Sequence, residues 1–246
     1  MIKTARKKER HQKPLNVPPK IAYDINASLE RIGLPNVYIG GRAVNAHSGG
    51  KERSSHDLDI ALLYKPSNQQ INLLTQNSHF SVENNPNMTS RYSLFYHSEE
   101  LQGTGKIKID LYYPGYVSSL YNFKPQHTLN GFPIAKIVME GETITVDGSP
   151  LKVAKREMLV VMKYLAWENR GNGNKSSKDM VDITNMIRTN YNDSREFEGF
   201  VNILKEVLRT NMPNDEERII HGILSNVDLK KINKDFVRIA REVIRK

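Results

Sequence analysis

The chain has 246 residues, enough for one large domain or two small ones, and its 38% hydrophobic and 26% charged residues are typical of a polar protein that can fold. It contains no cysteine, which excludes disulfide bonds and thiolate zinc sites and favours a cytoplasmic location. The longest apolar run, at 158–162, is far shorter than the roughly 20 residues that cross a bilayer. We therefore expect no membrane partner.

The net charge of +9 is concentrated at the two ends of the chain. Residues 1–20 carry seven Lys or Arg against one Glu, residues 228–246 carry seven against three acids, and the region between them is close to neutral. Basic ends suit a polyanion such as RNA. A solvated tail and a solvated helix face explain the same charges equally well, so charge alone does not choose between the two.

The first half of the chain mixes helix-like and strand-like patterns. Residues 1–19 are predicted to form a flexible basic arm that ends at two prolines. Apolar residues spaced by three and four over 20–33 predict an amphipathic helix, which Gly33 ends. A short strand then enters Gly40-Gly41. The elements predicted next are a helix over 42–48, a strand over 56–64, a helix over 67–77 and strands over 79–83, 91–97 and 106–113.

The second half is predicted to be almost entirely helical. Residues 114–150 are rich in Pro and Gly, with one predicted strand over 142–146 and a turn at Asp147-Gly148. From Leu151 onward the apolar period changes from two to three and four. Helices are predicted near 151–169, 178–189, 196–210, 215–225 and 229–245.

Two glycines, Gly40 and Gly41, stand between a predicted strand and a predicted helix. Without side chains they allow a ligand to approach the backbone closely. The free N–H groups and the positive dipole end of the helix form an anion site, for which a triphosphate is a suitable occupant. Arg42 adds a charged contact if its side chain turns back toward the helix start. The alternative is a plain turn, because most glycine pairs have no further role.

Asp57 and Asp59 interrupt an otherwise apolar strand. Side chains alternate across a strand, so both carboxylates point the same way, while Leu58 and Ile60 point into the core. Two carboxylates this close repel each other unless a cation lies between them, and Mg²⁺ commonly bridges carboxylates to substrate phosphates. The alternative for a D-x-D pattern alone is a solvated edge strand.

A third acid, Asp110, lies on the polar side of the predicted strand over 106–113. With Asp57 and Asp59 on a neighbouring strand, it completes a cage of three carboxylates for a metal. Such a cage suits a two-metal phosphoryl transfer, in which one ion activates the attacking hydroxyl and the other holds the leaving pyrophosphate.

The order strand, Gly-Gly, helix, strand with D-x-D and later strand with Asp resembles the nucleotidyltransferase superfamily of the DNA polymerase β type. Residues 53–59 fit an R-x-S-x-D-L-D pattern that is similar to the AbiEii branch, the toxins of bacterial abortive-infection and toxin–antitoxin systems. The resemblance implies Mg²⁺ or Mn²⁺ on the three acids and nucleotide contacts from Arg53 and Ser55. It also implies transfer of a nucleoside monophosphate from an NTP to a hydroxyl such as a tRNA 3′ end, with a small antitoxin protein as partner.

Lys163 lies among apolar neighbours on a predicted helix. A lysine there either reaches solvent with its ammonium group or meets a buried anion. The AbiEii resemblance extends to this helix and to a following K/R-D-x-x-D-L element, here Lys178-Asp179-Met180-Val181-Asp182-Ile183. It implies that Lys163 contacts the nucleotide phosphates and that Lys178 lies at the nucleotide site. Asp179 or Asp182, which share a helix face, would orient that lysine or the base.

Taken together, these patterns predict an α/β nucleotidyltransferase domain over 20–150, with a mixed sheet flanked by helices, and an α-helical domain over 151–246. The nucleotide is expected in the cleft between them. Two other functions remain open. A non-catalytic RNA-binding module on the same scaffold would bind RNA without the acids or a metal. A nucleotidyltransferase for a small molecule such as an aminoglycoside would be favoured by an acidic cleft.

Overall fold

A sheet-containing half is followed by a helical half in the computed structural model, which confirms the predicted fold class. The structure describes residues 17–49, 57–82, 91–101, 105–119, 122–126, 128–171, 174–191, 193–227 and 229–244. Most of the predicted basic arm and the predicted nucleotide contacts Arg53 and Ser55 lie outside these ranges. Within them, no helix combines the length and the apolar character needed to cross a membrane.

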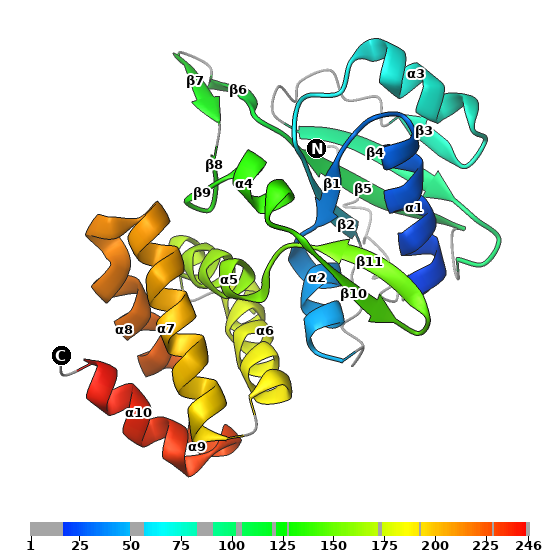
Figure 1. The fold of residues 1–246 in the computed structure, drawn as a ribbon. Helices are drawn as coiled ribbons and strands as arrows, with labels where there is room; N and C mark the ends of the chain where they lie inside the picture. The colour runs from blue at the N-terminus through cyan, green and yellow to red at the C-terminus, as the bar shows by residue number, and fades with distance from the viewer. Residues whose placement is uncertain are drawn as a thin grey trace, which may run out of the picture.

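Seven strands form one mixed sheet in the order β10-β11-β1-β2-β5-β4-β3 (Figure 1). At its centre, β2 runs parallel to β5 and antiparallel to β1. Leu58 and Ile60 on β2 are buried, so the alternation predicted for this strand is confirmed. The strands are β1 (Asn36–Tyr38), β2 (Asp57–Leu62), β3 (Phe80–Val82), β4 (Arg91–His97), β5 (Lys106–Tyr112), β10 (Glu142–Val146) and β11 (Ser149–Val153).

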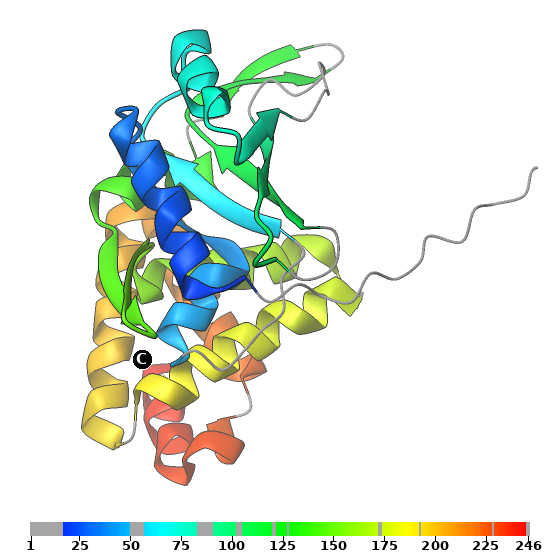
Figure 2. The same ribbon diagram turned by 90° about the vertical axis from the view of Figure 1, so that its right-hand side faces the viewer.

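Helices cover this sheet because each presents an apolar face to it. They are α1 (Pro19–Arg31), α2 (Gly40–His47), α3 (Asn68–Gln76) and α4 (Ile134–Met139). α1 packs on β1 and β11 and lies across the sheet in Figure 2, with Ile25 and Leu29 on its buried face. Gly33 follows the end of α1 at φ +76°, as expected for the glycine predicted to end this helix.

Two short hairpins precede α4 in the chain. β6 (Gly115–Ser119) pairs with β7 (Asn122–Gln126), and β8 (Thr128–Leu129) pairs with β9 (Phe132–Pro133). The sequence analysis predicted no strand over these residues, because the many Pro and Gly residues of 114–150 favour turns and loops.

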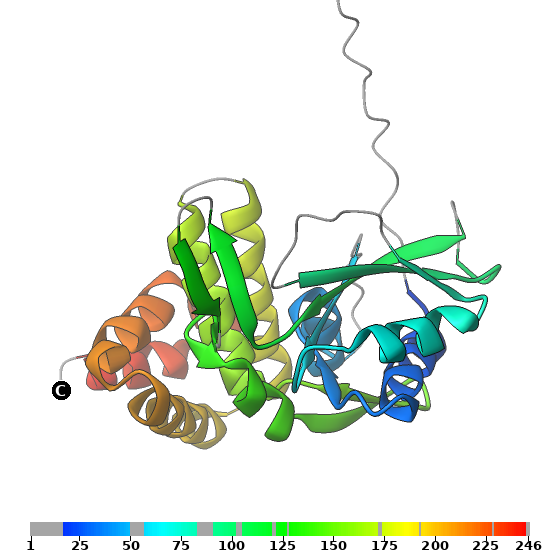
Figure 3. The same ribbon diagram turned by 90° about the horizontal axis from the view of Figure 1, so that it is seen from above.

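The helical half lies beside the sheet when the molecule is seen from above (Figure 3). Its helices are α5 (Arg156–Arg170), α6 (Asn174–Asn190), α7 (Ser194–Asn211), α8 (Glu216–Asn226), α9 (Leu229–Ile232) and α10 (Lys234–Ile244). The helix predicted from 151 begins at Arg156 instead, because 149–153 form β11, which pairs with β10 and β1. The last predicted helix is divided at Asn233 into α9 and α10.

One continuous apolar core joins the two halves. α2 contributes to this joint, since it contacts β2 and β11 on one side and α5 and α6 on the other. The packing of α2 therefore fixes its first residues relative to both the sheet and α5.

Candidate functional site

Three acids converge at the centre of the sheet. β2 and β5 are parallel neighbours with Asp59 paired to Asp110, and Asp57 lies two residues before Asp59 on the same face of β2. One carboxylate oxygen from each acid lies within 4.8 Å of those of the other two. Asp57 and Asp59 are half-buried and Asp110 is fully buried. The structure thus brings together the three residues predicted as metal ligands, while their binding of a metal stays a prediction.

Neighbouring side chains hold two of these carboxylates in place. Ser93, opposite Asp110 on β4, donates a hydrogen bond of 2.7 Å from its Oγ to Asp110 Oδ1, and Lys108 Nζ lies 3.7 Å from the same oxygen. Tyr112 donates from its hydroxyl to Asp59 Oδ1 at 3.2 Å. A buried carboxylate needs such partners because its desolvation is costly. The sequence analysis missed Ser93 and Lys108, whose role depends on strand register rather than on a motif.

Gly40 packs directly against the acid cluster. Its φ is +60°, and a Cβ atom at this position would lie 2.2 Å from Asp59 Oδ2. A side chain would therefore occupy the space beside the carboxylate, and the conformation itself disfavours any other residue. Three carboxylates packed this closely repel one another in the absence of a cation. Their hard oxygen donors fit Mg²⁺ or Mn²⁺.

The start of α2 faces the same region. α2 begins at Gly40, and its N-cap residue Ile39 provides no side-chain hydrogen bond to the first N–H groups. Those N–H groups can donate hydrogen bonds to an anion, as the sequence analysis predicted for Gly40 and Gly41. Arg42 does not contribute in the way considered there. Its buried side chain turns to the carbonyl oxygen of Val17, to which Nη1 donates at 3.0 Å, and burial lowers the pKa of the guanidinium.

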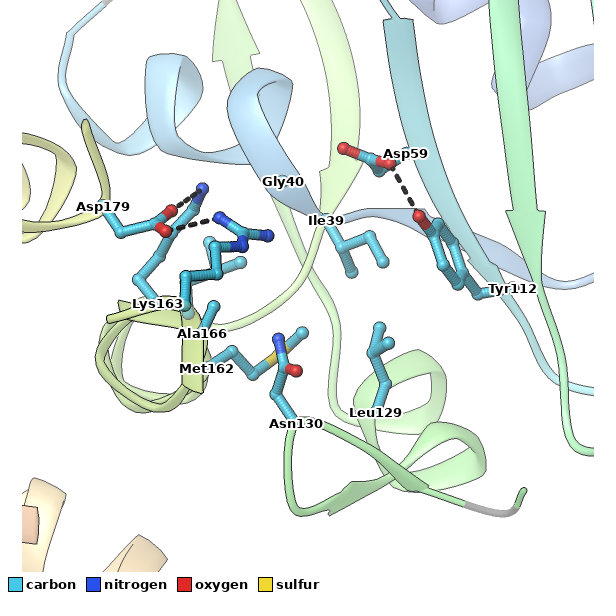
Figure 4. Close-up of a pocket in the computed structure, with 12 residues that line it drawn as sticks. Ile39, Gly40, Asp59, Tyr112, Leu129, Asn130, Met162, Lys163, Ala166 and Asp179 are labelled. Atoms are coloured by element: carbon cyan, nitrogen blue, oxygen red, sulfur yellow. Dashed lines mark hydrogen bonds and ion pairs between the residues drawn. The ribbon is translucent and has the colours of Figure 1, made fainter. Parts of the chain in front are cut away.

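A cavity of about 130 Å³ lies between the two halves (Figure 4). Asp59 and Tyr112 line it on the sheet side, and Lys163, Arg170 and Asp179 line it on the helical side. The rest of the wall comes from α5, from the β8–β9 hairpin and from the residues that start α2. These residues are Leu159, Met162, Ala166, Leu129, Asn130, Ile39 and Gly40.

Lys163 forms ion pairs with the two acids predicted to accompany it. Its Nζ lies 3.0 Å from Asp179 Oδ1 and 3.0 Å from Asp182 Oδ2, and the side chains of both acids are only 2% exposed. Lys163 therefore meets buried anions rather than reaching into solvent. Arg170 Nη1 approaches the second oxygen of Asp179 at 2.5 Å. Lys178 is exposed and does not line the cavity, so its predicted nucleotide contact gains no support from this geometry.

Arg170 and Asn130 are among the cavity residues that the sequence analysis did not recognise. Arg170 lies seven residues after Lys163, two helical turns along the same face, so helical spacing from Lys163 would have found it. Asn130 begins an Asn-Gly pair, which is the strongest short signal for a two-residue hairpin. Each signal was present in the sequence, but nothing there showed that these segments face the acid cluster.

No family model and no curated protein matches this sequence. Among solved structures, it is similar to an antigenic nucleotidyltransferase-like protein from Paracoccidioides brasiliensis, with 15% identity and a TM-score of 0.50 over 87% of this chain and 95% of that chain. A lincomycin-bound lincosamide antibiotic adenylyltransferase, LnuA, gives 14% identity and a TM-score of 0.44 over 70% of this chain and 97% of that chain. The antibiotic-resistance factor ANT(2'')-Ia gives 12% identity and a TM-score of 0.47 over 82% of this chain and 97% of that chain. The first of these similarities shows that the chain has the nucleotidyltransferase fold.

Proposed function

We propose that this protein is a metal-dependent nucleotidyltransferase that moves a nucleoside monophosphate from an NTP to an acceptor hydroxyl and releases pyrophosphate. The observation that carries the proposal is the position of the three acids. Asp57, Asp59 and Asp110 meet beside a cavity whose opposite wall holds Lys163 and Arg170. Carboxylates for a divalent ion on one side and cations for phosphates on the other are the two requirements of phosphoryl transfer.

On this proposal, the three acids hold Mg²⁺ or Mn²⁺. A divalent ion there would offset the negative charge on the phosphates and make the attacking hydroxyl more acidic. The N–H groups at the start of α2 would bind phosphate oxygens, since Gly40 lines the cavity and the helix dipole favours negative charge there. The residues thus act by positioning and by charge neutralisation.

The ion pairs of Lys163 fix its ammonium group in a position from which it can bind a phosphate. An ammonium group has three N–H donors, and two of them are directed to Asp179 and Asp182. The third can donate to a phosphate oxygen, and the lysine side chain does not have to be ordered first because the ion pairs already fix it. Arg170, about half exposed, adds a second cation at the same wall. This arrangement supports the phosphate role that the AbiEii resemblance implies for Lys163.

The acceptor that the charge favours is RNA. Both ends of the chain are basic and the net charge is +9, which suits a polyanionic partner better than a cationic drug. Together with the AbiEii resemblance, this supports a tRNA 3′ end as the acceptor and a toxin role, with a small antitoxin protein as partner. The direct assay is incubation of the protein with total tRNA and each α-labelled NTP in turn, with Mg²⁺, with Mn²⁺ and with EDTA. An aminoglycoside arm tests the small-molecule alternative.

Asp59→Asn tests the metal assignment. The variant keeps the volume and the hydrogen bond from Tyr112 but removes one carboxylate, so transfer should fall by roughly a hundredfold or more. Asp147→Asn is the matched control, since Asp147 is exposed at a turn where asparagine adopts the same backbone. Full activity of Asp59→Asn would contradict the metal assignment. RNA binding that needs neither Asp59 nor metal, without transfer from any NTP, would identify a binding module instead.

A further inference from the structure

The β8–β9 hairpin turns at two residues with left-handed backbone. Asn130 has φ +45° and Gly131 has φ +84°, and Leu129 pairs with Phe132 across the turn. Positive φ at both central residues is the geometry of the tight hairpin turn that favours Asn followed by Gly. The turn therefore sets the direction of the Asn130 side chain.

The tip of this hairpin is seated against the helical half. A Cβ atom on Gly131 would lie 2.6 Å from Met212 Cε and 3.3 Å from Leu165 Cδ1, so the backbone itself contacts these side chains. Phe132, the next residue, is completely buried. The hairpin tip is thus fixed by packing on both sides, and a side chain that it presents keeps a defined position.

Asn130 points from the hairpin into the cavity between the halves (Figure 4). Leu129 from the hairpin and Met162 and Ala166 from α5 provide apolar parts of the wall on this side, while the wall as a whole is divided between apolar and polar side chains. Among the described residues, none forms a hydrogen bond with the Asn130 side chain. The amide is partly buried, and its donor and acceptor are left to solvent or to a ligand. A ligand that fills the cavity can supply the missing hydrogen bonds.

We propose that Asn130 is a specificity-determining residue that reads the edge of the nucleobase of the incoming nucleotide, an inference that rests on the proposed function. Its amide presents a donor beside an acceptor, which complements the edge of a base. A phosphate offers acceptors only, and the cations for it, Lys163 and Arg170, are already present in the wall. The flat faces of a base suit the apolar side chains of Leu129 and Met162.

The chemistry of the amide divides the four bases into two classes. Adenine and cytosine present an amino donor beside a ring-nitrogen acceptor, whereas guanine and uracil present a carbonyl acceptor beside a ring N–H. The proposal requires that the filled cavity hold the amide in one orientation, which pairs with one class and clashes with the other. The enzyme should then prefer one class, and equal use of all four NTPs by the wild type would overturn the proposal.

Asn130→Gly tests whether the amide determines base specificity, because glycine keeps the left-handed backbone and removes only the amide. The quantity to measure is the ratio between preferred and non-preferred NTPs, taken from Mg²⁺-dependent NTP affinity and from kcat/KM. We expect this ratio to fall by roughly tenfold, through loss with the preferred class. The matched control is Asp147→Gly, which makes the same backbone change at φ +47° in the exposed β10–β11 turn and should leave the ratio intact.

Asn130→Asp adds a second, independent readout. Aspartate also tolerates positive φ but only accepts hydrogen bonds when ionised, so the variant should shift the preference toward GTP, because the N1–H and the amino group of guanine are adjacent donors, whatever the wild type prefers. An unchanged ratio in Asn130→Gly, or an equal change in Asp147→Gly, overturns the assignment of Asn130 and leaves the proposed function standing. If the wild type binds none of the four NTPs with Mg²⁺, the proposed function fails and this assignment fails with it.

Discussion

Gly40 illustrates how a single residue can determine the chemistry of this site. Its left-handed φ and its contact with Asp59 impose separate costs on any replacement. Gly40→Ala should lose about 1–2 kcal/mol of unfolding free energy from the backbone alone, and the added methyl group should also displace the Asp59 carboxylate. We therefore expect loss of transfer and of the Mg²⁺-dependent stabilisation by NTP.

Gly148→Ala separates these two costs. Gly148 has φ +78° in the β10–β11 turn, and a Cβ atom there would have no neighbour within 4 Å. Urea unfolding should show a loss of stability in both variants, larger in Gly40→Ala because of the contact with Asp59, whereas transfer should survive in Gly148→Ala only. Equal activity in the two variants would show that the close approach of Gly40 to Asp59 has no functional role.

At the scale of the elements, the packing of α8 against α5 depends on another glycine. A Cβ atom on Gly222 would lie 1.9 Å from the hydroxyl oxygen of Tyr164, which is buried on α5 next to Lys163. Gly222→Ala should force Tyr164 to shift and should cost about 1–3 kcal/mol of unfolding free energy. Gly199→Ala on α7 is the control, since a Cβ atom there meets nothing, and alanine should stabilise that helix by about 0.5–1 kcal/mol. A stabilised Gly222→Ala would argue against this packing.

The same scale shows what periodicity can and cannot reveal. The amphipathic spacing in α1 and the alternation in β2 were enough to predict both elements, because each buries one regular face. β11 was predicted as the start of a helix, since its position depends on pairing with β1, more than a hundred residues earlier. The acids on β2 and β5 were recognisable as a pattern. Ser93 and Asn130 were not, and Arg170 could be found only through its helical spacing from Lys163, because only the tertiary structure places these residues near those acids.

Considered as a whole, the molecule depends on the junction between its halves, because the cavity takes its walls from both. His47 lies at this junction. Its Nε2 is 2.8 Å from the carbonyl oxygen of Ala154, and Asn190 on α6 donates to the carbonyl oxygen of His47 at 2.6 Å. The side chain is buried, and this desolvation lowers the pKa of the imidazole below its usual value of 6.5 despite Glu142 nearby. The neutral form of His47 therefore belongs to the folded state.

This lowered pKa makes the junction sensitive to acid. Above about pH 6.5 the imidazole is neutral in both states and its titration has no effect on stability. Below that pH the unfolded chain binds the proton first, so the unfolding free energy falls until the pH also passes the lower pKa of the folded state. His47→Gln, whose amide can still donate to Ala154, should lose less stability than the wild type between pH 7 and pH 5 in urea unfolding. His221→Gln, an exposed change on α8, should follow the wild type. An equal loss in His47→Gln and the wild type would mean that the acid sensitivity arises elsewhere, because no other change distinguishes the two proteins.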